Sequence, residues 1–341
     1  MLTNCPLCSA SPSGVIHAFT SAEIADFFTP RSLSRAKYAR MVSILEGLWR
    51  RTAVKVVKCD ACAFCYADPF VAGTPEFYNL EAPDTPYPRD KWEYRRTLQQ
   101  LARWPETTST LLDVGAGKGY FLSQLIGRGW EPRNLMAAEF STLGRSAIER
   151  LGVECYQGDV RSLSTDRRFD AICLFQVLEH LDGYDELFAA LSRLSKPNAH
   201  LFVAVPNGAR IDLNERLGLL LDLPPNHISR WTPRSVQILA EKYGWTVESC
   251  ELEPETSMTQ EAAYAAVNRF IRTAYLPRSW ARAVFKVADR NLPEGSTLNK
   301  AVKTFGMVVS PSVWLTSARA AYEARNGGIP HALWAHLRKK G

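Results

Sequence analysis

The sequence predicts an α/β fold, a doubly wound Rossmann-like sheet preceded by a small cysteine-bearing module. Strand-like and helix-like patterns alternate through the middle of the chain, which is typical of a mostly parallel sheet. A buried strand at 111–114 runs into three alternating glycines at 115–119, and a helix follows from about Tyr120. Two C-x-x-C pairs stand near the N-terminus. Together these features indicate a nucleotide-type binding sheet with a metal-binding leader.

Composition sets the broad class of the protein. A chain of 341 residues can bury a sizeable core, and a formal net charge of +6 is too small to argue for nucleic-acid binding. No charged segment followed by an apolar run opens the sequence, and no uncharged apolar stretch is long enough for a membrane span. Eight cysteines without a secretory signal favour a reducing compartment, so we expect a cytoplasmic protein.

Four cysteines form the candidate metal site. Cys5 and Cys8 make one C-x-x-C knuckle, and Cys59 and Cys62 make a second that follows a strand-like run. Four thiolates suit tetrahedral zinc, and a site with no open position is structural rather than catalytic. The competing interpretation is that these are buried free cysteines, which are common in cores. We favour zinc because two pairs occur rather than one.

The core sheet is predicted from five strand-like runs. Their residue ranges are 111–114, 134–140, 153–160, 169–175 and 200–206, the last after a turn at 196–199. Parallel sheets of this kind bind ligands beyond the carboxyl ends of their strands. Three carboxylates fall at or just past such ends: Asp113, Glu139 and Asp159. The sequence therefore predicts one crevice with three acids around a glycine turn.

The three acids indicate which class of ligand the crevice binds. The spacing Gly115-x-Gly117-x-Gly119 lacks the third glycine of a dinucleotide fingerprint, and Asp113 directly before it would repel a pyrophosphate. An NAD-linked oxidoreductase is therefore disfavoured. Glu139 is placed to take both ribose hydroxyls, and Asp159 is placed to accept from an adenine amine. An adenosine with a cationic amino-acid tail fits all three acids, which points to S-adenosylmethionine (SAM).

These motifs resemble those of class I SAM-dependent methyltransferases. The resemblance rests on D-V-G-A-G-K-G at 113–119, G-D-V at 158–160 and F-D-A-I-C-L-F-Q-V-L-E-H at 169–180. It covers about residues 107–250, and it implies two further strands, near 246–252 and 332–337, that give the sheet an antiparallel end. The cofactor-binding residues that it implies are Asp113, Gly115, Ala116, Gly117, Glu139, Phe140, Asp159, Val160, Phe175 and Gln176.

The leader is similar to one found on some of these enzymes. The two knuckles, followed by Tyr66-x-x-Pro69, resemble the zinc-binding leader of sugar C-methyltransferases and related small-molecule enzymes. The expected division of the chain is a zinc-binding leader, a linker with a lead-in helix, a SAM-binding core, a helical insertion, and a last core strand with its tail. The corresponding ranges are 1–75, 76–104, 105–254, 255–330 and 331–341.

Two histidines are candidate general bases. His180 follows the fourth strand, where a structural hydrogen bond is an equally good interpretation. His227 lies in a loop whose two prolines fix the backbone that presents it, which favours a functional role. The loop resembles the family's substrate-facing P-P-x-H segment. Some RNA and quinone methyltransferases hold a metal with E-x-x-E-H, but Gln176 replaces the first acid here, which argues against a catalytic magnesium.

The segment 255–330 is basic and is predicted to be helical, with aromatic side chains and three interrupting prolines. It is interpreted as a lid over the substrate, with an oligomer face as one alternative. A peripheral contact of helices 260–325 with an anionic membrane is another.

The leading functional hypothesis is a SAM-dependent methyltransferase acting on a small molecule, a sugar or nucleotide-linked sugar. One alternative is an RNA or protein methyltransferase that grips a polymer with its zinc module and basic helices. Another is a SAM-binding or zinc scaffold protein without activity. Labelled SAM and a panel of acceptors would discriminate among the three.

Overall fold

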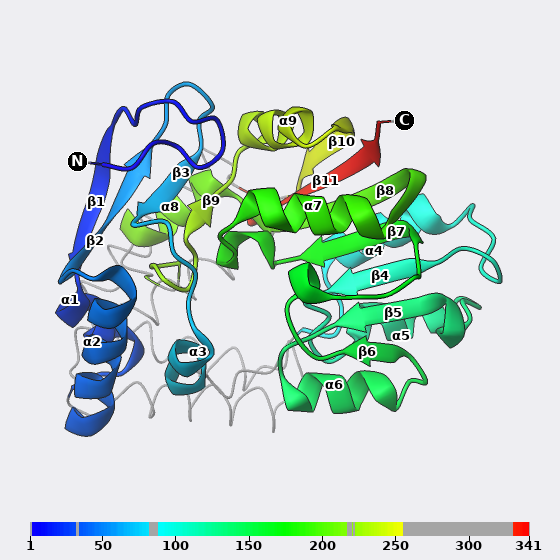
Figure 1. The fold of residues 1–341 in the computed structure, drawn as a ribbon, viewed down its shortest axis with the longest axis horizontal. Helices are drawn as coiled ribbons and strands as arrows, with labels where there is room; N and C mark the ends of the chain where they lie inside the picture. Colours follow the sequence, from blue (N-terminus) through cyan, green and yellow to red (C-terminus); the bar gives the residue numbers. More distant parts are fainter. Residues whose placement is uncertain are drawn as a thin grey trace, which may run out of the picture.

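The chain builds two sheets that lie side by side (Figure 1). The computed structural model describes residues 2–31, 34–81, 88–216, 220, 222–254 and 330–340. The expected α/β class and the seven-stranded sheet are confirmed. The predicted helical insertion, including the basic stretch 260–325, lies outside the described residues apart from its last position.

The larger sheet has the strand order β10-β11-β8-β7-β4-β5-β6. Its five strands from β4 to β8 run parallel, and β11 is antiparallel to both of its neighbours, as the family resemblance implies. The strands are β4 (Leu111–Val114), β5 (Leu135–Ala138), β6 (Glu154–Tyr156), β7 (Phe169–Phe175), β8 (Ser195–Pro206), β10 (Trp245–Leu252) and β11 (Ala332–Lys339).

The second strand, expected over 134–140, spans Leu135–Ala138, and two other strands differ more from their predicted ranges. The third strand, expected over 153–160, ends at Tyr156, because its partner β5 ends at Ala138 directly opposite. The fifth strand begins earlier, at Ser195 rather than His200. The expected turn at 196–199 is a bulge within the strand, since the register against β7 shifts there.

Helices cover both faces of the larger sheet. Along β4, Leu111 belongs to one buried cluster while Leu112 and Val114 belong to another, as the two-residue period of a strand requires. The first cluster is closed by α4 (Trp92–Leu101), α5 (Tyr120–Ile126) and α6 (Thr142–Glu149). The second is closed by α7 (Tyr184–Leu194) and α9 (Pro233–Lys242), which lie in front in Figure 1.

The smaller sheet is antiparallel, with the order β1-β2-β3-β9. Three of its strands come from the N-terminal segment, but the fourth comes from more than 160 residues later in the chain. The strands are β1 (Gly14–Thr20), β2 (Ala53–Lys58), β3 (Cys65–Asp68) and β9 (Ser229–Arg230). The helices that accompany them are α1 (Ser21–Phe28), α2 (Arg35–Trp49), α3 (Pro75–Glu81) and α8 (Gly208–Arg216).

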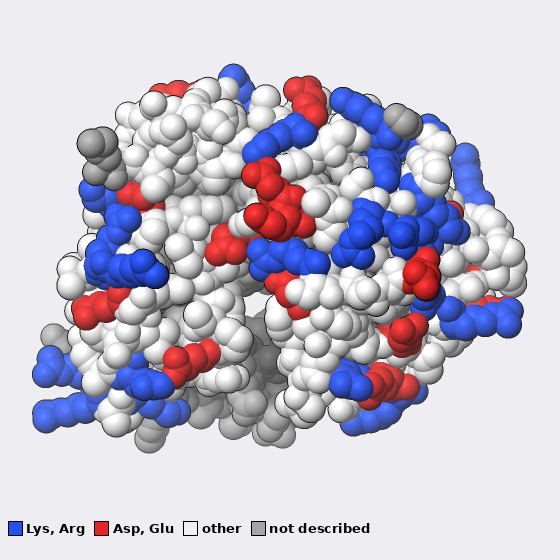
Figure 2. All heavy atoms as spheres, in the orientation of Figure 1, with Lys and Arg blue, Asp and Glu red and all other residues white. Residues whose placement is uncertain are grey.

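The carboxyl ends of the parallel strands point toward the smaller sheet (Figure 1). The face drawn in Figure 2 is hollowed between the two sheets, and acidic and basic side chains are interspersed over it. Within the described part of the chain, no helix has the length and apolar character needed to cross a membrane.

Trp334 anchors α4 to the antiparallel end of the larger sheet. Its ring is fully buried in β11, and its Nε1 donates a hydrogen bond to Oγ1 of Thr97 at 2.9 Å. The Arg96 guanidinium lies 4.8 Å from the centre of the same ring and pairs with both oxygens of Glu251 on β10. One aromatic side chain thus ties the helix to β11, while Arg96 ties it to β10.

We expect Trp334→Ala to lower the free energy of unfolding by about 3–5 kcal/mol, because it empties a large buried volume and orphans the Thr97 hydroxyl. Urea unfolding followed by circular dichroism measures the change. The control is Trp104→Ala, which removes a half-buried indole from the lead-in segment. Equal losses in the two variants would contradict the anchoring role of Trp334.

Candidate functional site

The glycine turn follows β4 and is fastened to the neighbouring strand. The Gly115 amide donates to the carbonyl of Ala138 at 2.8 Å, and Gly115 takes a positive φ of 69°. A Cβ at this position would lie 2.4 Å from Cγ2 of Val177, so only glycine fits. Ala116 is buried behind the turn. The turn therefore approaches the segment that follows β7 closely.

Glu139 closes the turn from the end of β5. Its Oε2 accepts from the Gly117 amide and its Oε1 from the Ser141 amide, both at 2.8 Å. The backbone amide of Glu139 donates to the carbonyl of Tyr156 on β6, which fixes the residue between two strand ends. The predicted ribose-binding acid thus lies against the glycine turn, where a ligand hydroxyl would exchange with these amide donors.

Asp113 is buried directly before the turn. Burial and, to a lesser extent, the charge of Glu139 raise the pKa of its carboxyl against the opposing charge of Lys91, to about 8 in total. A carboxyl of this kind stays protonated near neutral pH unless a cation is bound beside it. A positively charged ligand bound here would stabilise the ionised form of the Asp113 carboxyl.

Asp159 has a partner that sequence reasoning missed. It caps the short 3-10 helix η2 (Val160–Ser162), where its Oδ1 accepts from the Arg161 amide at 2.8 Å and its Oδ2 from Arg161 Nε at 2.9 Å. Burial opposes the charge, but the bonds from Arg161 outweigh it and lower the pKa of Asp159. Val160 is buried. A base amine at this place would share the carboxylate with a guanidinium.

The remaining predicted cofactor residues fall into different environments. Phe140 is 59% exposed beside Glu139, which leaves its ring available to an apolar ligand face. Phe175 is buried, and its ring packs edge-to-face with Phe121 at 4.9 Å between centroids. Gln176 takes a positive φ of 58°, and its Nε2 donates to Oε1 of Glu93 at 3.2 Å. Phe175 therefore contributes to the core, and Gln176 lies at the turn after β7.

The two candidate histidines come together. The 3-10 helix η3 (Leu178–His180) begins immediately after Val177, and the His180 ring makes an edge-on contact with the His227 ring at 4.6 Å between centroids. His180 Nδ1 lies 2.6 Å from the carbonyl oxygen of Asn226 and 3.2 Å from the Tyr78 hydroxyl. The histidines thus lie near the glycine turn that Val177 contacts.

His227 is paired with an acid that the sequence did not single out. Its Nδ1 lies 2.8 Å from Oδ1 of Asp222. Burial opposes a charge on this ring, but the bond and charge of Asp222 outweigh it, so the pKa of His227 is raised. Burial and, to a lesser extent, the charge of His227 together lower the pKa of His180 to about 3. No spacing signal connects Asp222 to His227, because both lie in an irregular loop.

Backbone bonds fix the loop that carries His227. The Ile228 amide donates to the carbonyl of Glu179 at 2.9 Å, and the Ile228 carbonyl accepts from the Ala67 amide at 2.8 Å. The loop is therefore held between η3 and β3 and continues directly into β9. The N-terminal sheet and the segment after β7 position this histidine jointly.

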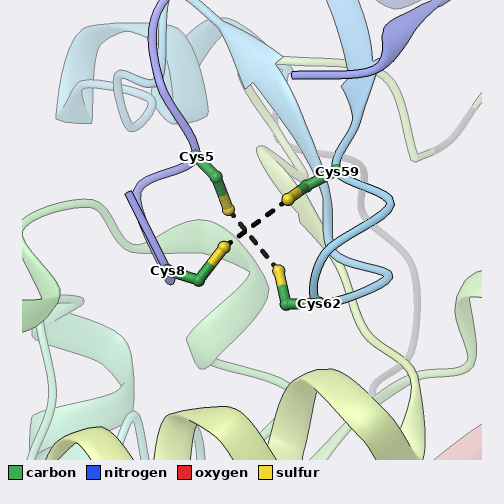
Figure 3. A group of neighbouring side chains, drawn as sticks. All are labelled: Cys5, Cys8, Cys59 and Cys62. Carbon is green, nitrogen blue, oxygen red and sulfur yellow. Dashed lines mark hydrogen bonds between the residues drawn. The ribbon is translucent and has the colours of Figure 1, made fainter. Parts of the chain in front are cut away.

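The four predicted zinc ligands form one cluster (Figure 3). The Sγ atoms of Cys5 and Cys62 are 3.6 Å apart, and those of Cys8 and Cys59 are 3.5 Å apart. Two sulfurs on a tetrahedral zinc are about 3.8 Å apart at a Zn–S distance of about 2.3 Å, whereas a disulfide requires about 2.05 Å. The geometry fits a zinc ion and does not fit disulfides.

A separate cavity of about 560 Å³ lies at the other end of the strands, where β4, β7 and β8 begin. It is lined by residues before β4 and at the starts of β7 and β8, among them Trp104 and His200. Its Lys196 is paired with Asp170 at 2.7 Å. The cavity is remote from the carboxyl ends of the strands and includes none of the predicted site residues.

One family model matches the part of the chain that carries the motifs. Residues 89–250 match the sequence model of a family described as "Methyltransferase domain". No curated protein matches the sequence. The solved structures similar to this chain include a SAM-dependent methyltransferase from Archaeoglobus fulgidus, with 15% identity, a TM-score of 0.44, and 72% of this chain and 92% of that chain covered.

Two further solved structures show a comparable degree of similarity. A putative sarcosine dimethylglycine methyltransferase from Galdieria sulphuraria is 13% identical, with a TM-score of 0.43 over 72% of this chain and 84% of that chain. The N-methyltransferase NodS from Bradyrhizobium japonicum is 14% identical, with a TM-score of 0.40 over 74% of this chain and 100% of that chain.

The raised pKa of Asp113 predicts a pH-dependent cost to stability. The folded chain holds a proton that the unfolded chain loses above about pH 4, so stability falls as the pH rises from about 4 to about 8. We expect Asp113→Asn to raise the midpoint of thermal unfolding at pH 8 and to change it less at pH 5.

Asp170→Asn is the matched control, because the pKa of Asp170 is shifted in the opposite direction to that of Asp113. Burial raises the pKa of Asp170, but its bonds from Lys196 and Thr110 outweigh burial and hold the pKa below its usual range. We therefore expect the control to lose stability at neutral pH. A stability difference for Asp113→Asn that does not change between pH 5 and pH 8 would contradict the burial argument.

Proposed function

Since residues 89–250 belong to the methyltransferase domain family, we propose that the protein transfers a methyl group from SAM to a small-molecule acceptor, a sugar or nucleotide-linked sugar. The observation that carries the proposal is the grouping of Asp113 and Glu139 around the glycine turn, with the exposed ring of Phe140 beside them. A buried acid beside a carboxylate that can exchange its amide donors for ligand hydroxyls suits a ligand with a cationic tail and a hydroxylated sugar.

Each part of SAM has a matching group in this crevice. Glu139 would take the ribose hydroxyls, and the glycine amides at 115–117 would approach the amino-acid tail. Phe140 would cover the adenine, and Asp159 would accept from its amine while keeping its bond to Arg161. Asp113 would ionise when the cationic end binds beside it. The attraction between the two buried charges would then favour binding.

The acceptor side is assigned to the histidine cluster. SAM supplies a methyl group on a sulfonium, so the protein has to position the acceptor and remove its proton. The Asp222 carboxylate, 2.8 Å from Nδ1 of His227, favours a proton on that nitrogen and leaves the Nε2 lone pair for the acceptor. His180 is similarly anchored through Nδ1 on Asn226. His227 therefore acts on the acceptor through Nε2, close to the segment that contacts the glycine turn.

The zinc ion has a structural role in this proposal. The four thiolates would leave it no open position, and Phe64 beside the second knuckle packs against Trp231 at 4.7 Å between ring centroids. Trp231 directly follows β9, which continues the loop of His227. The zinc module would therefore stabilise the acceptor loop from behind. The sugar class rests on the likeness of this leader to those of sugar methyltransferases.

The first test separates the two halves of the site. His227→Ala is expected to lose about 10²- to 10⁴-fold in kcat, the usual contribution of a group acting on the acceptor proton, while its affinity for SAM is unchanged. Glu139→Ala is expected to weaken SAM binding about 10- to 100-fold, because it loses charged hydrogen bonds. Calorimetry with SAM and transfer of labelled methyl to nucleotide sugars measure the two effects.

His200→Ala is the control for this pair, since it removes a histidine at the opposite edge of the sheet. It should bind SAM and turn over like the unchanged protein. Binding of SAM without methyl transfer to any nucleotide sugar or extract component would overturn the proposed activity. Turnover of His227→Ala equal to that of the control would remove this histidine from the mechanism.

The zinc prediction concerns both metal content and stability. Cys59→Ser is expected to remove one zinc ion per chain as measured by elemental analysis, and to lower the midpoint of thermal unfolding, because binding energy at a structural zinc is folding energy. Cys155→Ser, at a half-buried cysteine on β6, is the control and should retain the zinc. Protein that is free of zinc yet equally stable would contradict the assignment.

A further inference from the structure

Glu179 is a fully buried acid. It has no exposed surface, and neither carboxylate oxygen makes a hydrogen bond to any residue that the structure describes. A buried carboxylate normally has a donor or a cation beside it, because removal from water is costly. The Nε2 atom of His180 lies 3.9 Å from Oε1 of Glu179.

The two neighbouring histidines both present the nitrogen that a metal uses. His180 donates its Nδ1–H to the carbonyl oxygen of Asn226 at 2.6 Å, and His227 holds its Nδ1 against Asp222 at 2.8 Å. An acceptor bound to Nδ1 fixes the tautomer and leaves a lone pair on Nε2. Metal-ligating histidines are typically held in this way by a carboxylate or a backbone carbonyl.

We propose that Glu179, His180 and His227 bind one divalent transition-metal ion at the acceptor side of the site. One ligand atom from each residue lies within 4.8 Å of the others. Ligands of a single ion at about 2.1 Å are up to about 4 Å apart, so the cluster has to contract by less than about 1 Å. The unpartnered carboxylate and the two anchored imidazoles are independent observations that point to the same ligand.

The ligand set selects the class of metal. Two imidazoles and one carboxylate suit manganese, iron, cobalt or zinc, whereas magnesium and calcium prefer oxygen ligands. Gln176, one turn earlier, adds no carboxylate, and its amide is engaged by Glu93. Magnesium is therefore disfavoured, as the sequence predicted, and a transition-metal ion is favoured. Three protein ligands leave open positions for water or an acceptor oxygen.

The inference rests on the proposed methyl transfer and deepens it. An ion at this place would bind a hydroxyl oxygen of the acceptor and lower its pKa. The O–H proton then passes to water, the oxygen forms a bond to the methyl carbon, and the carbon–sulfur bond breaks with its electron pair on sulfur. The Nε2 lone pair of His227 would then act on the acceptor proton through the bound ion, so His227→Ala is expected to lose turnover in this arrangement as well. The favoured acceptors are those with a hydroxyl group.

The test measures metal binding without turnover. Full-length protein carrying zinc in its cysteine site is dialysed against Co²⁺, and both metals are counted by elemental analysis. Zinc holds a site more tightly than cobalt, so the cysteine site keeps its zinc. We expect one divalent ion per chain more in the unchanged protein than in Glu179→Gln, which preserves the shape of the side chain. Asp222→Asn should weaken Co²⁺ binding about 10- to 100-fold.

His200→Ala is the matched control and should retain the additional ion. Affinity for SAM and the thermal unfolding midpoint, measured for each variant, show that the fold and the cofactor site are intact. Equal metal content in the unchanged protein and in folded Glu179→Gln would overturn the metal site while leaving methyl transfer standing. Metal binding with no methyl transfer would instead overturn the proposed function alone.

Discussion

The pairing of β9 with β3 is the constraint on which the acceptor side of this protein depends. Only Ser229 and Arg230 make up the strand, yet they fasten the loop of His227 to the N-terminal sheet. On its other side the loop bonds to Glu179 through Ile228. A histidine on an irregular loop is thereby held as firmly as one on a regular element, which is what a catalytic or ligating group requires.

A buried ion pair stabilises the same junction. Arg230 and Glu215 are 4% and 8% exposed, and their side chains lie 2.5 Å apart between β9 and α8. His17 on β1 reaches the other oxygen of Glu215 at 3.3 Å. Burying such charges costs desolvation energy, so their benefit is specificity: no other register of β9 would bring Arg230 to this acid.

The sequence predicted those features that depend on local pattern. The glycine turn, its flanking strand and the acids at strand ends follow from short motifs, and the strands over 111–114 and 169–175 have their expected bounds. The cysteine cluster followed from spacing. These features need only neighbours in the chain, or the general rule that parallel strands end at one edge of a sheet.

The missed features depend on contacts between distant segments. A two-residue strand carries no periodic signal, so the membership of β9 in the N-terminal sheet could not be predicted. The pairing of Asp222 with His227 and of Asp159 with Arg161 arises from loop geometry. The metal interpretation of Glu179 likewise needs the burial and the missing hydrogen bonds, which no motif reports. Phe175, a predicted cofactor contact, is buried among Tyr94 and Phe121.

The position of β11 also governs the order in which the molecule can assemble. The strand lies between β8 and β10 but is made last of the seven, so β8 has an open edge until residues 332–339 have left the ribosome. An unpaired edge in the middle of a hydrophobic sheet is a site for wrong pairing. The larger sheet therefore closes only after synthesis of its last strand, and the nascent chain has to keep that edge protected until then.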